Sequence, residues 1–172
     1  MDSMEAMGYV IERLETAWIP PGFIPSPDLH VYEPMRADQF LDDLAVAIEF
    51  APGKRYLEVG SGIGTKLLPA EQMGLEVHGI ELRESYIAVS QYLCPNAPVE
   101  LADARYYTGY GAFDIIHCYK PVTSFEALAE LDEHIASHMK QGAILIHPYW
   151  APKANRLYTV APTRRPDVWV RD

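Results

Sequence analysis

Residues 57–64 read LEVGSGIG, and this stretch decides the fold. It completes an apolar run at 55–59, RYLEV, which is typical of a buried strand, and a helical pattern follows it. Alternating glycines let the backbone turn tightly and let a ligand approach without meeting a Cβ atom. A helix that begins behind such a turn offers free N–H groups and the positive end of its dipole. The stretch therefore predicts a strand–turn–helix unit that binds a ligand at the end of the strand.

The spacing of the glycines at 60, 62 and 64 separates this loop from two phosphate-binding loops. The NAD fingerprint GxGxxG needs a glycine at position 65, where the chain has Thr65. A P-loop needs a lysine directly after a glycine, and Lys66 does not follow one. Glu58 would repel a pyrophosphate but suits a ligand with a positive amino group. Glu81 ends the next predicted strand, where a carboxylate accepts hydrogen bonds from ribose hydroxyls.

Strand and helix patterns alternate along the rest of the chain. Further strands are predicted at 76–80, 98–102, 113–119 and 143–147, with helices at 65–73, at 85–93 and from the capping-box sequence TSFE at 123–126 to residue 139. Two short runs, 157–161 and 167–171, follow without a helix between them and predict an antiparallel hairpin. The order predicts an α/β fold of Rossmann type, with a mostly parallel sheet and helices on both faces.

One domain of 172 residues is expected, with N-terminal helices and a proline-rich arm at 1–51 and a ligand-binding core at 52–172. The N-terminal part predicts a helix at 3–18, an extended arm at 19–37 and a second helix at 39–50 with Asp38 as its N-cap. Pro69 conflicts with a helix that begins at Thr65. Either the proline kinks that helix, or the helix begins later, near Leu67 or Leu68.

Composition and charge limit the function classes. The net charge is −10, of which residues 1–86 carry −9, so bulk electrostatics disfavour nonspecific nucleic-acid binding. The basic stretch 153–172 keeps a local patch open. The sequence has no apolar run long enough to cross a membrane and no signal-peptide pattern, which predicts a cytoplasmic protein. Cys94 and Cys118 have no metal-binding spacing and are expected to be reduced thiols.

The run from Glu58 to Gly64 resembles the first motif of the class I S-adenosylmethionine-dependent methyltransferases, (E/D)-x-G-x-G-x-G, and matches it in full. The resemblance covers residues 54–172 and implies a seven-stranded sheet whose last strand inserts antiparallel. It implies S-adenosylmethionine as the cofactor, with Glu58 near its amino group and Glu81 on its ribose. The other cofactor-binding residues that it implies are Gly60, Ser61, Gly62 and Gly64 around the methionine portion and Leu82, Asp103 and Ala104 around the adenine.

The methyl acceptor has no recognisable motif. In parallel sheets ligands lie at the carboxyl ends of the strands, so the residues after the fourth and fifth strands should face the methyl group. His117 and His147 are candidate bases there, and Lys120 could orient an anionic acceptor, although ordinary packing explains each of them as well. No metal site is expected, since His134 and His138 have no third ligand nearby. The remaining aromatic candidates for a lid or acceptor pocket are Trp18, Phe23, Tyr32, Tyr149 and Trp150.

Three functions follow from these observations. The first is methyl transfer to a small molecule or an exposed protein side chain, with nucleic acid a less favoured acceptor. The second is a non-catalytic scaffold that binds S-adenosylmethionine or activates a partner subunit. The third, a nicotinamide or flavin oxidoreductase, is disfavoured by Thr65 and Glu58. No segment remains for a substrate domain, so we expect an open site or one completed by a second copy of the chain or a partner subunit.

Overall fold

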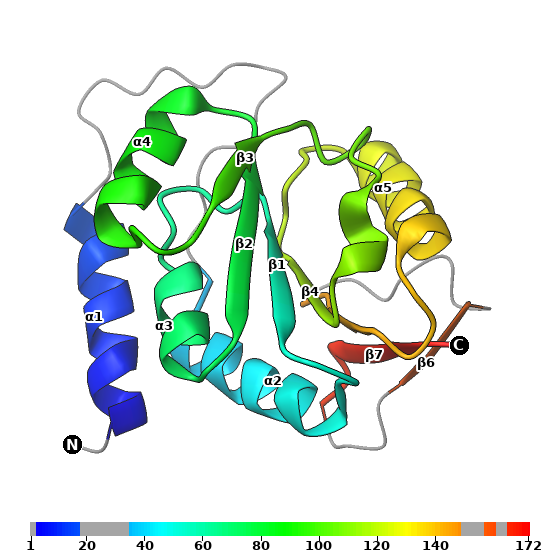
Figure 1. Cartoon of the computed structure of the whole chain (residues 1–172), viewed down its shortest axis with the longest axis horizontal. Helices are drawn as coiled ribbons and strands as arrows, with labels where there is room; N and C mark the ends of the chain where they lie inside the picture. Colours follow the sequence, from blue (N-terminus) through cyan, green and yellow to red (C-terminus); the bar gives the residue numbers. More distant parts are fainter. Residues whose placement is uncertain (1–2, 18–34, 149–156, 161–164) are drawn as a thin grey trace.

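A computed structural model describes residues 3–17, 35–148, 157–160 and 165–172 (Figure 1). The helices are α1 (Ser3–Ala17), α2 (Ala37–Phe50), α3 (Leu67–Gln72), α4 (Glu84–Leu93), α5 (Phe125–His138) and the 3-10 helix η1 (Gly109–Ala112). The strands are β1 (Arg55–Val59), β2 (Glu76–Glu81), β3 (Val99–Leu101), β4 (Ile115–Cys118), β5 (Ile144–Ile146), β6 (Tyr158–Val160) and β7 (Val168–Arg171). Within these residues no helix is both long and apolar enough to cross a membrane.

The seven strands form one sheet in the order β3-β2-β1-β4-β5-β7-β6. Strands β1 to β5 pair in parallel, whereas β7 pairs antiparallel with both β5 and β6. The predicted mostly parallel sheet with an inserted antiparallel last strand is therefore confirmed. Since β1 lies between β2 and β4, the chain reverses its direction of travel across the sheet at β1, and such a switch point opens a ligand crevice at the carboxyl ends of the strands.

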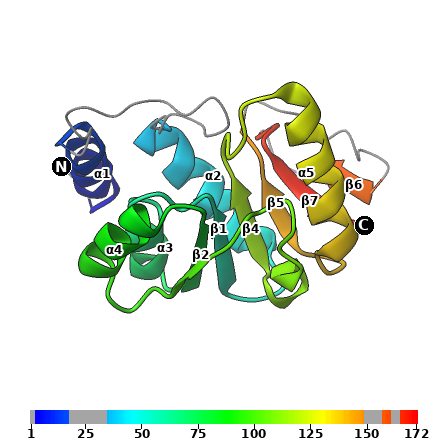
Figure 2. The ribbon, with the colours of Figure 1, turned by 90° about the horizontal axis from the view of Figure 1, so that it is seen from above.

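Helices cover both faces of the sheet, and alternate residues of each strand point to opposite faces. On the α2 face, side chains of α2 and α3 such as Phe40 and Leu67 pack against Tyr56 and Ile115. On the α5 face, Leu131 of α5 and Tyr110 of η1 pack against strand residues that include Leu57. Figures 1 and 2 both show α1, α3 and α4 gathered at one end of the molecule and α5 with β7 and β6 at the other.

The conflict at Pro69 is resolved by a late helix start. Helix α3 begins at Leu67, with Lys66 as its N-cap, so Pro69 is its third residue. The first four N–H groups of a helix have no partner within the helix, and a proline there removes nothing. The prediction of a start at Thr65 was therefore wrong, and the alternative of a start near Leu67 is confirmed. Gly74 follows the helix with a φ of +85°, as expected of a terminating glycine.

Two predicted helix caps were placed wrongly. Asp38 lies within the first turn of α2, whose N-cap is Arg36, and the Arg36 guanidinium binds the Asp38 carboxylate. The N-cap of α5 is Ser124 rather than Thr123, because the Ser124 hydroxyl accepts the N–H of Ala127 at 3.0 Å. At α5 two adjacent hydroxyl residues offered competing caps, whereas α2 begins one residue before Asp38 without a side-chain cap. The proline-rich arm lies almost wholly outside the described residues.

Substituting glycines at positive φ tests how the loop after β1 is packed. In Gly64→Ala (φ +88°) the new Cβ would lie 2.4 Å from Ser90 Oγ, whereas in Gly74→Ala (φ +85°) it meets nothing within 4 Å. We expect the left-handed backbone alone to lower the free energy of unfolding of Gly74→Ala by about 1–2 kcal/mol. Gly64→Ala should lose about 1–3 kcal/mol more, from overpacking. Urea unfolding of both variants measures this, and equal losses would contradict it.

Candidate cofactor site

The glycine loop leaves β1 through three residues that all have positive φ. Gly60, Gly62 and Gly64 have φ of +71°, +55° and +88°, a region that other residues seldom adopt. The carbonyl oxygen of Ile80 on β2 accepts the N–H groups of both Gly60 and Ser61 at 2.9 Å. The loop is therefore fixed to the neighbouring strand at the carboxyl ends of the parallel strands, where Gly60 is exposed and Gly62 and Gly64 are buried.

The Glu81 carboxylate joins this loop to the end of β2. It is 8% exposed, and its Oε2 accepts the N–H of Gly62 at 2.8 Å. Its Oε1 accepts the N–H groups of Leu82 and Arg83 at 2.9 and 3.0 Å. A carboxylate offers about four lone-pair positions, so one position remains after these three bonds. The carboxylate is thus held rigidly beside the loop with room to accept a hydroxyl group.

Glu58 points to the α2 face beneath the loop. Its carboxylate is 4% exposed and accepts hydrogen bonds from the Tyr56 hydroxyl and from His117 Nδ1, which lies 2.8 and 2.9 Å from its two oxygens. The contact with His117 follows from strand register, because Glu58 on β1 is paired with His117 on β4. Burial and the Glu58 charge raise the pKa of Tyr56 well above its ordinary value, so its hydroxyl stays protonated.

Apolar side chains and a clasped carboxylate follow β2 and β3. Leu82, directly after β2, and Leu101, the last residue of β3, are 46% and 51% exposed. Asp103 comes next, and Arg105 binds both of its carboxylate oxygens, with Nε at 3.0 and 3.2 Å. The hydrogen bond from Arg105 holds the pKa of Asp103 below its ordinary value. The carbonyl oxygen of Ala104 accepts the Tyr110 hydroxyl at 2.8 Å, which fixes this turn.

The three residues proposed to act on the acceptor have different surroundings. Lys120 follows β4 with a φ of +43°, and the next residue, Pro121, lies against Gly60 of the loop. His117 is fully buried on the α2 face. His147 follows β5, is 1% exposed, and has its Nε2 2.9 Å from Oδ1 of Asp132 on α5. The structure thus brings Lys120 next to the loop and binds each histidine to a buried acid.

Sequence reasoning missed three residues of this region: Tyr56, Arg105 and Asp132. A signal for Asp132 existed, since it interrupts the apolar stripe of α5 made by residues such as Leu131 and Ile135, and acids are seldom fully buried unless paired. Tyr56 precedes Glu58 by two residues and therefore shares its face of the strand. Nothing in the sequence marked Arg105. The aromatic candidates Trp18, Phe23, Tyr32, Tyr149 and Trp150 lie outside the described residues.

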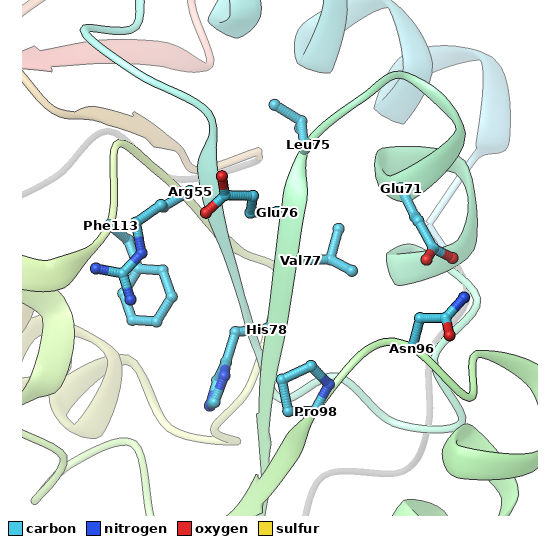
Figure 3. Close-up of a pocket in the computed structure, with 9 residues that line it drawn as sticks. All are labelled: Arg55, Glu71, Leu75, Glu76, Val77, His78, Asn96, Pro98 and Phe113. Atoms are coloured by element: carbon cyan, nitrogen blue, oxygen red, sulfur yellow. The ribbon is translucent and has the colours of Figure 1, made fainter.

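A hollow of about 350 Å³ lies where the parallel strands begin, at the end of the sheet opposite to the glycine loop (Figure 3). It is lined by Arg55 and Glu76, the first residues of β1 and β2, together with His78 and Phe113. The Arg55 guanidinium stacks over the Phe113 ring at 5.3 Å, and burial lowers the pKa of His78. Since β1 separates this edge from the glycine loop by about 13 Å, the hollow is not part of the same site.

The histidine pair on α5 bonds to backbone. Nε2 of His134 lies 2.7 Å from the carbonyl oxygen of Tyr107, and Nδ1 of His138 lies 2.8 Å from the carbonyl oxygen of His134. Among the described residues no cluster of three or more histidine, cysteine or acidic side chains is arranged to hold a metal ion. These contacts with backbone carbonyl oxygens account for the positions of His134 and His138 without a metal ion.

Removing Arg105 tests the state of Asp103. In Arg105→Ala the pKa of the Asp103 carboxyl should rise toward its ordinary value, because its strongest hydrogen-bond donor is lost. The pair is exposed (46% and 22%), so the free energy of unfolding should change by less than about 1 kcal/mol. NMR titration of the carboxyl carbon measures the pKa, with Arg13→Ala on α1 as a charge-matched control. An unchanged titration of Asp103 would contradict the clasp.

Comparison with known proteins agrees with this geometry. A family model described as a methyltransferase domain matches residues 32–168. No curated protein sequence matches significantly. Similar solved structures include a sugar N-methyltransferase from Streptoalloteichus sp ATCC 53650, with 22% identity and a TM-score of 0.55 over 76% of this chain and 62% of that chain.

Two further structures have the same fold. One is DesVI from Streptomyces venezuelae, with 21% identity and a TM-score of 0.54 over 71% of this chain and 61% of that chain. The other is an amino pentose methyltransferase from Micromonospora echinaspora with S-adenosylmethionine bound, at 22% identity and a TM-score of 0.53 over 68% and 50%. This chain thus spans half to about three fifths of the lengths of these proteins. Because the family model matches most of its length, the chain belongs to the methyltransferase-domain family, among the class I S-adenosylmethionine-dependent methyltransferases.

Proposed function

We propose that the chain binds S-adenosylmethionine at the carboxyl edge of the sheet and transfers its methyl group to a small molecule or an exposed protein side chain. One observation carries the proposal: the three positive-φ glycines and the Glu81 carboxylate, joined by the bond from the Gly62 N–H. The glycine loop lets a compact polar chain approach the backbone, and the fixed Glu81 carboxylate beside it can accept a ribose hydroxyl.

Each part of this edge has a counterpart in the cofactor. Glu81 accepts a ribose hydroxyl with its remaining acceptor position, and the exposed Leu82 packs on the adenine, beside Asp103 and Ala104. Gly60, Ser61, Gly62 and Gly64 surround the methionine portion, with the Glu58 charge beneath its amino group. S-adenosylmethionine supplies an activated methyl on a sulfonium, which leaves by in-line displacement. The chain's contribution is therefore mainly to align donor and acceptor, which can account for several kcal/mol of barrier reduction.

The acceptor is assigned to the ends of β4 and β5. Lys120, beside the loop, orients an anionic acceptor, and His147 acts as a base when the acceptor must lose a proton. Its Nε2 lies 2.9 Å from Oδ1 of Asp132, so a negative charge on Asp132 would stabilise the imidazolium that forms when His147 takes up a proton. The net charge of −10 makes nucleic acid the less favoured acceptor. Amino sugars are the first small molecules to test, since solved structures of similar fold include a sugar N-methyltransferase.

A second candidate function is a scaffold that binds the cofactor without methyl transfer. The observation that favours it is that His117 and His147 are both buried, at 0% and 1% exposure. A scaffold would still bind the cofactor through Glu81, and a partner subunit or a second copy of the chain would supply the acceptor site.

Calorimetric titration tests cofactor binding. Wild-type protein should bind S-adenosylmethionine and S-adenosylhomocysteine but not NAD. Glu81→Ala should weaken both at least about tenfold, because hydrogen bonds to a charged group contribute about 1.5–3 kcal/mol each. Glu84→Ala removes an exposed acid three residues away, at the start of α4, and should change neither. Folded wild-type protein that binds neither sulfur compound would refute the proposal.

Transfer of a labelled methyl group separates the enzyme from the scaffold. With amino sugars and unmodified peptides as acceptors, we expect label in product, and we expect Lys120→Ala to lower kcat or raise KM while the Kd for S-adenosylhomocysteine stays within about twofold. Cofactor binding with no transfer to any acceptor, alone or with added partner protein, would favour the scaffold.

A further inference from the structure

A buried polar cluster lies beneath the glycine loop on the α2 face, and the reaction proposed above uses only one of its members. Tyr56, Glu58 and His117 are 0%, 4% and 0% exposed. The Tyr56 hydroxyl bonds to Glu58, and His117 Nδ1 lies 2.8 Å from Oε1 and 2.9 Å from Oε2 of the same carboxylate. Phe40 of α2 packs edge-on against the His117 ring, with 5.1 Å between the ring centroids, and closes the cluster from below.

The hydrogen-bond inventory fixes the donors. An ionised carboxylate only accepts hydrogen bonds, so in this arrangement Glu58 accepts from the Tyr56 hydroxyl, and from His117 in the tautomer with a proton on Nδ1. Burial and the Glu58 charge keep the Tyr56 hydroxyl protonated. The Tyr56 hydroxyl and His117 Nδ1 therefore hold both Glu58 oxygens in one orientation, two residues before the first glycine of the loop.

Charged residues of α2 and of the C-terminal segment also lie near the cluster. Asp43 of α2 is buried nearby, and burial together with Asp167 raises its pKa to about 6, against the lowering effect of Arg165. The Arg165 guanidinium lies 3.8 Å from the Asp43 carboxylate and also pairs with Asp42, so it is bound to acids of α2. The Glu58 carboxylate keeps Tyr56 and His117 as its partners, and a carboxylate in a medium of low dielectric constant interacts strongly with a nearby cation.

We propose that His117 and Tyr56 are positioning residues that hold the Glu58 carboxylate in one orientation at the base of the glycine loop, so that the site selects ligands bearing an amino group at the methionine end. This inference rests on the proposed function. In this inference His117 contributes to recognition of the cofactor rather than to the acceptor. Selection for the amino group depends on Tyr56 and Glu58 of β1 and on His117 of β4.

The test compares two ligands that differ only at the amino group. One is S-adenosylhomocysteine, and the other is its analogue with hydrogen in place of the amino group. For wild-type protein the ratio of the two Kd values should be at least about tenfold in favour of the amino compound, as expected of a charge-assisted hydrogen bond. Glu58→Gln should bring the ratio close to one, whereas Glu100→Gln, an exposed acid on β3, should leave it unchanged.

Variants of His117 and Tyr56 then test whether these two residues position Glu58. His117→Leu fills a similar volume without a donor and should reduce the ratio at least about fivefold, with the Kd for the analogue lacking the amino group nearly unchanged. His117→Asn places an N–H donor near the position of Nδ1 and should restore most of the ratio. Tyr56→Phe should reduce it by a smaller factor, because His117 still contacts both carboxylate oxygens.

The outcomes are distinguishable from failure of the proposed function. Binding of the analogue by each variant reports that the site is folded, and thermal unfolding of each variant provides a second check. If His117→Leu weakened both ligands equally, His117 would be merely structural and the inference would be overturned. If wild-type protein bound the two ligands equally, Glu58 would not read the amino group, and the inference would fail while cofactor binding stood. Only the absence of binding to both ligands would refute the proposed function itself.

Discussion

The chain turns at the end of β1 through Gly60, Gly62 and Gly64, all with positive φ, and several neighbouring elements are fitted to that turn. The carbonyl oxygen of Ile80 on β2 accepts two N–H groups of the loop, and Ser90 of α4 leaves no space for a side chain at position 64. A side chain at any of the three positions would cost about 1–2 kcal/mol in backbone strain alone. Because the loop occupies residues up to 64, the next helix begins only at Leu67, which is why Pro69 is tolerated.

A second feature is the burial of acid–histidine pairs on both faces of the sheet. Glu58 and His117 lie on the α2 face, while Asp132 and His147 meet at 2.9 Å after β5. Burying an acid lowers the stability of the fold unless the acid has a partner. Such pairs contribute little net stability, so a role in the site is the better explanation for them. Cys118 follows His117 on β4, and burial together with the charges of Asp132 and Glu58 raises its pKa well above the ordinary value. It stays a protonated thiol, which agrees with the structural role expected of it.

The sequence predicts the order of elements better than the direction of individual side chains. Strands such as 55–59 are bounded by glycines or prolines and alternate with helices, so a mostly parallel α/β sheet follows from the connection rules. Every residue of β4 is buried, and such a strand shows no period from which to tell which face His117 occupies. Its contact with Glu58 depends on the register between β1 and β4, which local sequence does not encode. The choice of Ser124 over Thr123 as a cap is likewise decided by backbone geometry.

Charge connects the site to the chemistry of the family. S-adenosylmethionine carries a sulfonium and an ammonium group, whereas the product after methyl transfer keeps only the ammonium. Of the acids near the loop, Glu81 is bonded to backbone N–H groups and Glu58 to Tyr56 and His117, while Arg105 binds Asp103. Interactions between charges strengthen in a site shielded from water. In the proposed arrangement, the carboxylates beside the loop should therefore attract the sulfonium form more strongly than the neutral thioether, so that loss of the methyl group weakens the attraction and favours release of the product.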